Sequence, residues 1–352
     1  MRLNVKFALA AFLIGFGFIA LASLLIGGRA ASAAQIQRSA FNGPTGIAMC
    51  GTHVWVTNAS DNSVTELNAL NGEKVQVMNG PSSEFYEPMG VTANGTDLWV
   101  ANLSGNSVSE INCGSGTSVR TISSGSLNAP VAIAAGGAKV WVASQAHQND
   151  TKGNIIPNSS SVNAFSTRVG SLDEAIAGAN ANGFNGSSGI SVSGGKVWVT
   201  NANGDSLSEL DAKTGDVIRV VGQSAGSFNW PMGVASNGAY VWVANLEGNS
   251  LTEIDESTGS VLRVVTGDGL EGPDSICFLG NEIWVTNLYG NSVTELSARN
   301  GDLIRVINSK SDGFSAPMGI TGRDASIWVT NQWSNTVTEL VASSGSLERV
   351  LH

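Results

Sequence analysis

Six glutamates recur at one position of a repeated fourteen-residue pattern, and carboxylates of this kind can act as general acids or bases. The pattern reads VWVTNASDNSVTEL at 54–67, and near-copies begin at 98, 197, 241, 283 and 327, with a broken copy at 140. The glutamates are Glu66, Glu110, Glu209, Glu253, Glu295 and Glu339. Because six symmetric copies suit a building role better than one-sided chemistry, we expect each to form a hydrogen bond to the neighbouring unit.

Two other side-chain types could carry chemistry. The chain has three histidines, His53, His147 and His352, and the two internal ones fall in turns that we expect at opposite ends of their strands. No G-x-S-x-G elbow occurs, so a Ser–His–Asp site has no support. Cys50, Cys113 and Cys277 show no metal-ligand spacing, and we expect three small buried side chains, with at least one unpaired because their number is odd. We expect no catalytic residue, bound metal or cofactor.

The elements that carry these residues repeat seven times. The tryptophan of each copy marks the register, and successive intervals are 44, 42, 57, 44, 42 and 44 residues. A Phe or Leu stands fourteen residues before each tryptophan, as an independent second marker. Each unit contains four short segments with the alternation or β-branched content of strands. The tryptophans are Trp55, Trp99, Trp141, Trp198, Trp242, Trp284 and Trp328.

A period in the forties with four strands per unit indicates an all-β, seven-bladed β-propeller, with four antiparallel strands per blade and blades continuous in sequence. We expect the propeller to span 35–352. The tryptophans should lie between adjacent blades, and the recurrent Phe or Leu should fill the gap between them. The Asn that ends each VWVTN-type strand should bond to neighbouring backbone groups at a turn.

The P-x-G-[IV], [VI]-W-V-[TA]-N and N-S-[VL]-[TS]-E-[LI] elements resemble those of YVTN/NHL-type propellers and, most closely, the streptogramin lyase-like (virginiamycin B lyase-like) branch. The resemblance covers residues 41–352 and implies a propeller fold. It also implies an elimination that uses His and Glu side chains with a divalent metal at the channel mouth. No position of this chain matches the histidine pair, so no catalytic residue is carried over, and catalysis is the less favoured alternative.

Residues that break the sevenfold pattern mark a candidate binding surface, because blade-building residues repeat whereas binding residues need not. The third unit carries an insertion of twelve residues in the loop 144–158. This insertion is either part of a binding site or a surface extension without function. The connections between blades share its face, and their unique aromatics should be exposed. The candidate binding residues are His147, Asp150, Lys152, Tyr86, Trp230, Asp274 and Trp333.

Composition and targeting signals restrict the partner. The 352 residues carry a net charge of −10 with 13% charged residues, which argues against nucleic acid. Residues 1–34 have the basic, apolar and small-residue sequence of a signal peptide or signal anchor, and the apolar run 7–28 is long enough to tether the chain to a membrane. We therefore expect a secreted, periplasmic or cell-surface monomer that binds a protein, peptide or glycan. The alternatives are a lyase-like or lactonase-like metal-dependent enzyme and a structural envelope component.

Overall fold

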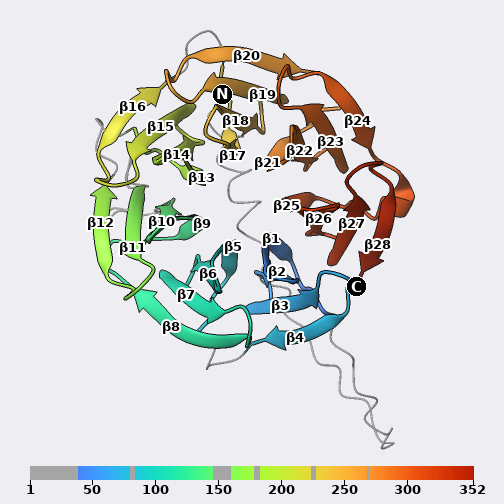
Figure 1. Ribbon diagram of the computed structural model, residues 1–352, viewed down its shortest axis with the longest axis horizontal. Helices are drawn as coiled ribbons and strands as arrows, with labels where there is room; N and C mark the ends of the chain where they lie inside the picture. The colour runs from blue at the N-terminus through green and yellow to red at the C-terminus, as the bar shows by residue number, and fades with distance from the viewer. Residues whose placement is uncertain (1–38, 80–83, 146–159, 178–182, 223–226, 268) are drawn as a thin grey trace, which may run out of the picture. The chain divides into compact units, whose positions relative to one another are not determined.

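The computed structural model describes residues 39–352 except 80–83, 146–159, 178–182, 223–226 and 268. The chain divides into two units, Met1–Ser39 and Ala40–His352, and every described strand belongs to the second. That unit is a ring of seven four-stranded sheets around a central axis, as Figure 1 shows. In each sheet the strands pair in sequence order and are antiparallel, from the inner strand at the axis to the outer strand at the rim. The predicted seven-bladed propeller is confirmed.

Each blade is continuous in sequence, as predicted. Blade 1 contains β1 (Pro44–Cys50), β2 (His53–Asn58), β3 (Ser63–Asn68) and β4 (Lys74–Met78). Blade 2 contains β5 (Pro88–Asn94), β6 (Asp97–Asn102), β7 (Ser107–Asn112) and β8 (Thr117–Ser123). Blade 3 contains β9 (Pro130–Gly136), β10 (Lys139–Ser144), β11 (Ser161–Ser166) and β12 (Leu172–Ala177). Blade 4 contains β13 (Ser187–Ser193), β14 (Lys196–Asn201), β15 (Ser206–Asp211) and β16 (Val217–Val221).

The last three blades follow the same plan. Blade 5 contains β17 (Pro231–Ser236), β18 (Tyr240–Asn245), β19 (Ser250–Asp255) and β20 (Val261–Thr266). Blade 6 contains β21 (Pro273–Leu279), β22 (Glu282–Asn287), β23 (Ser292–Ser297) and β24 (Leu303–Ile307). Blade 7 contains β25 (Pro317–Arg323), β26 (Ser326–Asn331), β27 (Thr336–Val341) and β28 (Leu347–Leu351). A short 3-10 helix, η1 (Lys310–Asp312), lies in the connection from blade 6 to blade 7.

The core lies between blades, where the two middle strands are covered on both sides. All seven tryptophans of the second strands are at most 1% exposed. Trp242 of blade 5, for example, packs against Leu270, Ile283 and Val285 of the next blade. Leu270 is one of the recurrent Phe or Leu residues, and its equivalents take the same place beside the preceding tryptophan in the other blades. The expected positions of both residues are confirmed.

A bulge near the start of each first strand shapes the end of the central channel. In β21 the ladder to β22 pairs Pro273 with Asn287 and then Ile276 with Val285, so Asp274 and Ser275 fall outside the regular register. The same irregularity occurs in the other first strands. A bulge redirects side chains that a regular strand would hold in the ladder. The seven residues that follow the initial Pro or Ser are Thr45, Met89, Val131, Ser188, Met232, Asp274 and Met318.

Hydrogen bonds between turns join the blades. In six blades the residue before the third strand has a positive φ, and its side-chain oxygen accepts a hydrogen bond from a backbone N–H at the entrance to the next blade. Asn249 Oδ1, for instance, lies 2.7 Å from Gly272 N. Asn335 Oδ1 lies 2.7 Å from Gly43 N and so closes the ring between blade 7 and blade 1. The left-handed conformation, which Asn tolerates well, directs these side chains across the gap.

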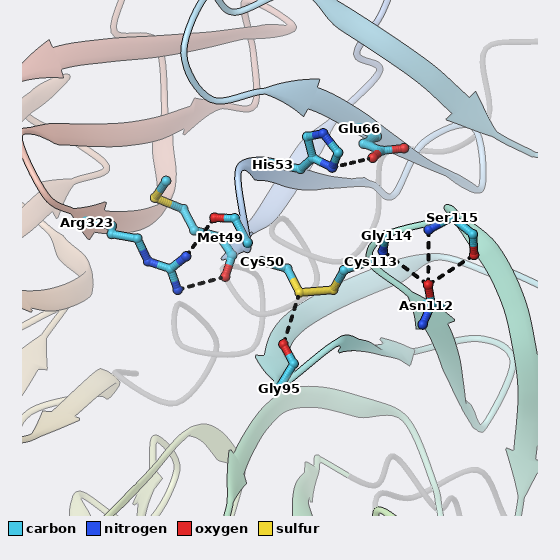
Figure 2. Close-up of a disulfide and its surroundings, with 11 residues drawn as sticks. Met49, Cys50, His53, Glu66, Gly95, Asn112, Cys113, Gly114, Ser115 and Arg323 are labelled. Atoms are coloured by element: carbon cyan, nitrogen blue, oxygen red, sulfur yellow. Dashed lines mark hydrogen bonds and ion pairs between the residues drawn. A yellow bond between two sulfur atoms is a disulfide. The ribbon is translucent and has the colours of Figure 1, made fainter.

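The expectation of three separate cysteines is wrong, because Cys50 and Cys113 form a disulfide (Figure 2). Cys50 ends β1 and Cys113 begins the turn between β7 and β8, so the bond joins blades 1 and 2. Blade packing brings together two residues that are 63 positions apart in sequence, which their spacing could not reveal. Cys277 is free. In the described part of the chain, no helix is long and apolar enough to cross a membrane.

Candidate functional site

The six repeated glutamates build the ring and do not converge on one site. Five pair with an arginine of the fourth strand of their own blade; the Glu209–Arg219 contact, for example, measures 2.6 Å. Arg219 then donates to the carbonyl of Thr258 in the next blade, and the other four arginines make equivalent bonds. The expected direct bond from glutamate to the neighbouring blade is therefore wrong: the arginine makes that contact, because only its longer side chain spans the gap.

The sixth glutamate engages one of the histidines. His53 Nδ1 lies 2.8 Å from Glu66 Oε1, as Figure 2 shows. Gln76 Nε2 donates to Glu66 Oε2 at 2.6 Å. Both side chains are therefore occupied in the structure of blade 1. His352 is exposed at the end of the chain, and His147 lies outside the described residues.

The asparagines that end the second strands also have structural partners. Asn58 is fully buried, and its Nδ2 donates to Ser63 Oγ at 3.1 Å and to Thr65 Oγ1 at 2.9 Å. The equivalent asparagines of blades 2, 4, 5, 6 and 7 repeat these contacts. Hydroxyl groups of the third strand are thus the main partners, in place of the expected backbone groups. An amide at this position can reach them because the antiparallel register places the first hydroxyl residue directly opposite the asparagine and the second diagonally across from it.

The candidate site lies on what we call the upper face, which carries the turns between second and third strands and the connections between blades. Three aromatic side chains more than a third exposed lie here: Tyr86 at 56%, Tyr289 at 46% and Trp333 at 69%. Among the described residues, no other aromatic side chain reaches that exposure. Tyr86 and Trp333 were expected on this face and are exposed on it. We missed Tyr289 in the sequence, although it holds the same turn position as Trp333. A search for aromatic residues that do not recur from blade to blade would have found it.

Trp230 differs from the expectation of an exposed ring, because it is only 7% exposed. Its φ is 55°, and its N–H donates to Asp205 Oδ1 at 2.8 Å. Gly272 takes the equivalent position in blade 6, where a Cβ would fall 2.4 Å from Tyr289 Cδ2. A side chain at this position is therefore directed at the turn of its own blade and not at solvent. The other expected site residues, His147, Asp150 and Lys152, lie outside the described residues.

Asp274 occupies the bulge of β21, is 8% exposed, and its Oδ1 is buried without a hydrogen-bond partner. Burial raises the pKa of its carboxyl from 3.8 to about 7, since removal from water disfavours the charged form. Met232 and Met318 hold the same strand position in the blades on either side and supply no compensating charge. Asp274 therefore places a carboxyl that titrates near neutral pH at the upper end of the channel.

Two residues in exposed turns of the upper face, Tyr289 and Glu247, interact with each other and lie near Asp274. The Tyr289 hydroxyl, in the turn between β22 and β23, donates to Glu247 Oε1 at 3.2 Å across the gap between blades 5 and 6. Desolvation raises the pKa of Tyr289, and the negative charges of Glu247 and Asp274 raise it further. Trp333 occupies the same turn position in blade 7. We call Glu247, Asp274 and Tyr289 the upper-face cluster.

The two faces differ in charge. The described loops of the upper face contain seven Asp or Glu residues and one Lys, whereas those of the opposite, lower face contain five acids and three Lys or Arg. Asp274 adds a further acid at the mouth of the channel. An excess of one charge on a surface attracts ligands of the opposite sign, so the upper face favours cationic groups.

The divalent metal implied by the resemblance does not fit these residues. The bulge position of the seven first strands offers one carboxylate beside thioether, hydroxyl and aliphatic side chains, and divalent metals such as Mg²⁺ require several oxygen ligands. In the described residues, no group of three or more His, Cys, Asp or Glu side chains could hold a metal ion. We therefore derive no reaction step through a metal.

Solved structures share this architecture. Virginiamycin B lyase from Staphylococcus aureus matches with a TM-score of 0.68 and 18% identity over 84% of this chain and 94% of its own. Its catalytically inactive histidine-to-alanine variant with quinupristin matches at 0.67, with 18% identity and the same coverage. Hydrazine synthase of Kuenenia stuttgartiensis matches at 0.69, with 17% identity over 86% of this chain and 96% of that one. No family model and no curated protein sequence matches the chain. At these identities the likeness concerns the fold: the chain has the seven-bladed propeller fold of the streptogramin B lyases.

Proposed function

We propose that this protein is an exported, non-catalytic binding protein that captures a protein, peptide or glycan outside the cytoplasm through its upper face. The observation that carries the proposal is the location of Tyr86, Tyr289 and Trp333, since all three exposed aromatic rings lie on that face. Exposed Tyr and Trp side chains supply large contact area at low entropic cost and are enriched in recognition surfaces. The acidic upper loops favour a basic protein or peptide over a neutral glycan.

The disulfide supports the exported part of the proposal. Cys50 and Cys113 lie in adjacent blades and are paired, and such bonds persist in oxidising compartments outside the cytoplasm. The apolar run 7–28 is compatible with either a cleaved signal or a membrane tether. The protein would accordingly be secreted, periplasmic or held at the cell surface, where we expect it to act as a monomer.

A lyase-like or lactonase-like enzyme is the second candidate, and one observation favours it. A carboxyl with a pKa near 7, such as that of Asp274, is suited to act as a general base. An elimination also needs a group that stabilises the developing negative charge. The exposed groups beside Asp274 are Glu247 and Tyr289, whose hydroxyl is already bonded to that glutamate. Because further negative charge opposes carbanion formation, the cluster suits binding of a cation better than elimination.

Capture of envelope proteins by the tagged, exported chain tests the proposal. We compare the wild type with a Tyr86→Ala, Tyr289→Ala, Trp333→Ala triple variant and with Leu70→Ala, a control on the lower face whose side chain is 87% exposed. The triple variant should lose at least about tenfold of the capture affinity, about 1.4 kcal/mol, while the control should not change it. Equal capture by all three proteins would contradict a partner on the upper face.

A further inference from the structure

Asp274 is a buried carboxyl group for which the fold supplies no charged partner. It is more than nine-tenths buried, and its Oδ1 has no hydrogen-bond donor. In the described part of the chain, neither Asp274 nor Glu247 forms an ion pair with Lys, Arg or His. A buried carboxylate without a partner destabilises a protein. Its presence therefore needs a reason other than the packing of the blade.

The other blades show what this strand position does for the fold. In blade 1 the hydroxyl of Thr45 donates to Pro88 O of the next blade at 3.2 Å, and in blade 4 the hydroxyl of Ser188 donates to Pro231 O at 2.7 Å. The remaining blades carry Met or Val at this position. A carboxyl can donate to a carbonyl only while it is protonated, and the Oδ1 of Asp274 makes no hydrogen bond. Asp274 therefore replaces neither the hydroxyl donor of blades 1 and 4 nor the apolar side chain of the other blades, which points to a ligand.

The neighbouring turns extend the acidic position toward solvent. Tyr289 packs over Gly272, remains 46% exposed, and links by its hydroxyl to Glu247, which is itself exposed. A cation beside Tyr289 would meet the aromatic ring and the Glu247 carboxylate, and the charge of Asp274, which acts on Tyr289, would attract it as well. An exposed cation–π contact alone contributes about 0.5–1 kcal/mol. Met232 and Met318, from the flanking first strands, offer adaptable apolar surface for an aliphatic chain.

We propose that Asp274, Glu247 and Tyr289 bind the ammonium group of a lysine side chain that the partner presents to the upper face, beside the start of β21. The proposal rests on the function proposed above and names the chemical group that the upper face recognises. A lysine suits the site because its compact charge lies at the end of a thin four-carbon stem. The planar guanidinium of arginine is better suited to a bidentate acceptor.

Binding should depend on pH in a defined direction. Among the described residues, the groups around Asp274 that titrate or carry charge are Tyr289, Glu247 on the adjacent turn, and Glu271, whose Cβ approaches Gly290. An ammonium group favours the ionised form of Asp274, so binding below its pKa of about 7 must release a proton. The affinity should therefore rise as the pH increases toward 8, while the lysine ammonium remains charged.

The test uses N-acetyl-lysine methylamide as the probe and N-acetyl-norleucine methylamide, which lacks the charge, as the matched control ligand. Titration of the exported chain is followed by NMR at pH 5.5 and pH 8. The lysine probe should saturate, bind at least about tenfold more tightly than the norleucine probe, and bind more tightly at pH 8. Asp274→Asn and Glu247→Gln should each weaken it, whereas Glu73→Gln, an exposed acid on the lower face, should not.

Several outcomes would overturn the lysine site. These are no saturable binding to wild type, equal binding of both probes, or unchanged binding by a folded Asp274→Asn variant. Thermal unfolding checks that the variants fold, and both substitutions keep the size of the side chain. The proposed function fails separately: if the triple aromatic variant captures partners as well as wild type, the upper-face partner is wrong even when the lysine probe binds. If capture depends on the aromatic rings but the probe does not bind, only the lysine site is wrong.

Discussion

At the scale of single residues, the repeated glutamates show how buried charges build a symmetric ring. Glu253 is fully buried, and its burial raises the pKa whereas Arg263 lowers it. Blade 3, which has Ala164 where the other blades have glutamate, reverses the arrangement. There Lys139 of the second strand lies 3.9 Å from Glu174 of the fourth strand and donates to Lys213 O of blade 4 at 2.9 Å. In both arrangements a cationic side chain donates to a backbone carbonyl of the next blade. Its carboxylate partner lies on the third strand in one arrangement and on the fourth strand in the other.

Asp274 gives a prediction at this scale because its ionisation opposes folding. Its pKa is about 7 in the folded protein against 3.8 normally, so the folded state binds more protons than the unfolded state between about pH 4 and pH 7. Stability contributed by this group is greatest at low pH and falls as the pH rises through 7. Asp274→Asn should therefore stabilise the protein at pH 8 by up to about 4 kcal/mol, and by little at pH 4.5.

Urea unfolding at the two pH values measures this difference. Asp302→Asn, at an exposed residue of the lower face, serves as the control and should show no such pH dependence relative to wild type. If Asp274→Asn and wild type keep the same difference in unfolding free energy at both pH values, the carboxyl does not titrate between them and the argument is wrong.

At the scale of elements, blade 1 is fastened to both neighbours on the lower face, as Figure 2 shows. The disulfide joins the end of β1 to the β7–β8 turn of blade 2. On the other side, Arg323 at the end of β25 donates to Gly51 O at 2.9 Å and to Met49 O at 3.5 Å. The first blade has no chain connection to blade 7, so these contacts hold its inner strand where covalent continuity ends.

Removal of the disulfide should destabilise the protein without changing the fold. The Cys50–Cys113 bond closes a loop with a sequence separation of 63, and such a bond typically contributes about 2–4 kcal/mol, largely by restricting the unfolded chain. The Cys50→Ser, Cys113→Ser double variant should therefore show a lower unfolding midpoint in urea. A reductant should shift the midpoint of wild type toward that of the variant and leave the variant unchanged. An equal midpoint for both oxidised proteins would show that the bond contributes nothing.

At the scale of the whole molecule, the ring closes by side-chain contacts and not by a shared strand. Blade 7 ends with its own fourth strand, β28, and blade 1 begins with its own first strand, β1. The seam is held by Asn335 Oδ1 on Gly43 N, by Arg349 on Leu70 O, and by Thr330 Oγ1 on Thr45 O at 2.7 Å. The asparagine and arginine contacts have equivalents between blades that the chain connects, whereas the seam lacks the covalent link and carries the additional Arg323 contacts.

The seam should therefore be the first interface to open. Asn335→Ala removes the turn contact at the seam, and Asn249→Ala removes the same contact between blades 5 and 6. Each loss should cost about 1 kcal/mol. Hydrogen exchange should accelerate in blades 1 and 7 of the first variant. No chain connection joins these two blades, so loss of a side-chain contact between them makes local opening easier. Similar acceleration around blades 5 and 6 in the second variant would show that the seam is no weaker than the other interfaces.

Much of the fold could be predicted from the sequence because seven copies of one pattern restrict the same structure seven times. The two independent markers, the tryptophan and the Phe or Leu before it, determined the number of blades and their boundaries. Alternation along each segment indicated strands, and the burial of Trp242 between blades follows from a large apolar ring on a strand covered on both sides. These properties depend on local pattern and on apolar surface, which a sequence displays directly.

The tertiary structure decided every contact that crosses from blade to blade. It paired Cys50 with Cys113, directed the arginines and not the glutamates to the next blade, and turned Trp230 away from solvent. It also brought Tyr289 to Glu247 and set Asp274 beside them at the mouth of the channel. Such contacts depend on sheet twist, on the bulge in each first strand and on side-chain reach across a gap. None of these quantities can be read from the order of residues, because they arise only when neighbouring sheets pack.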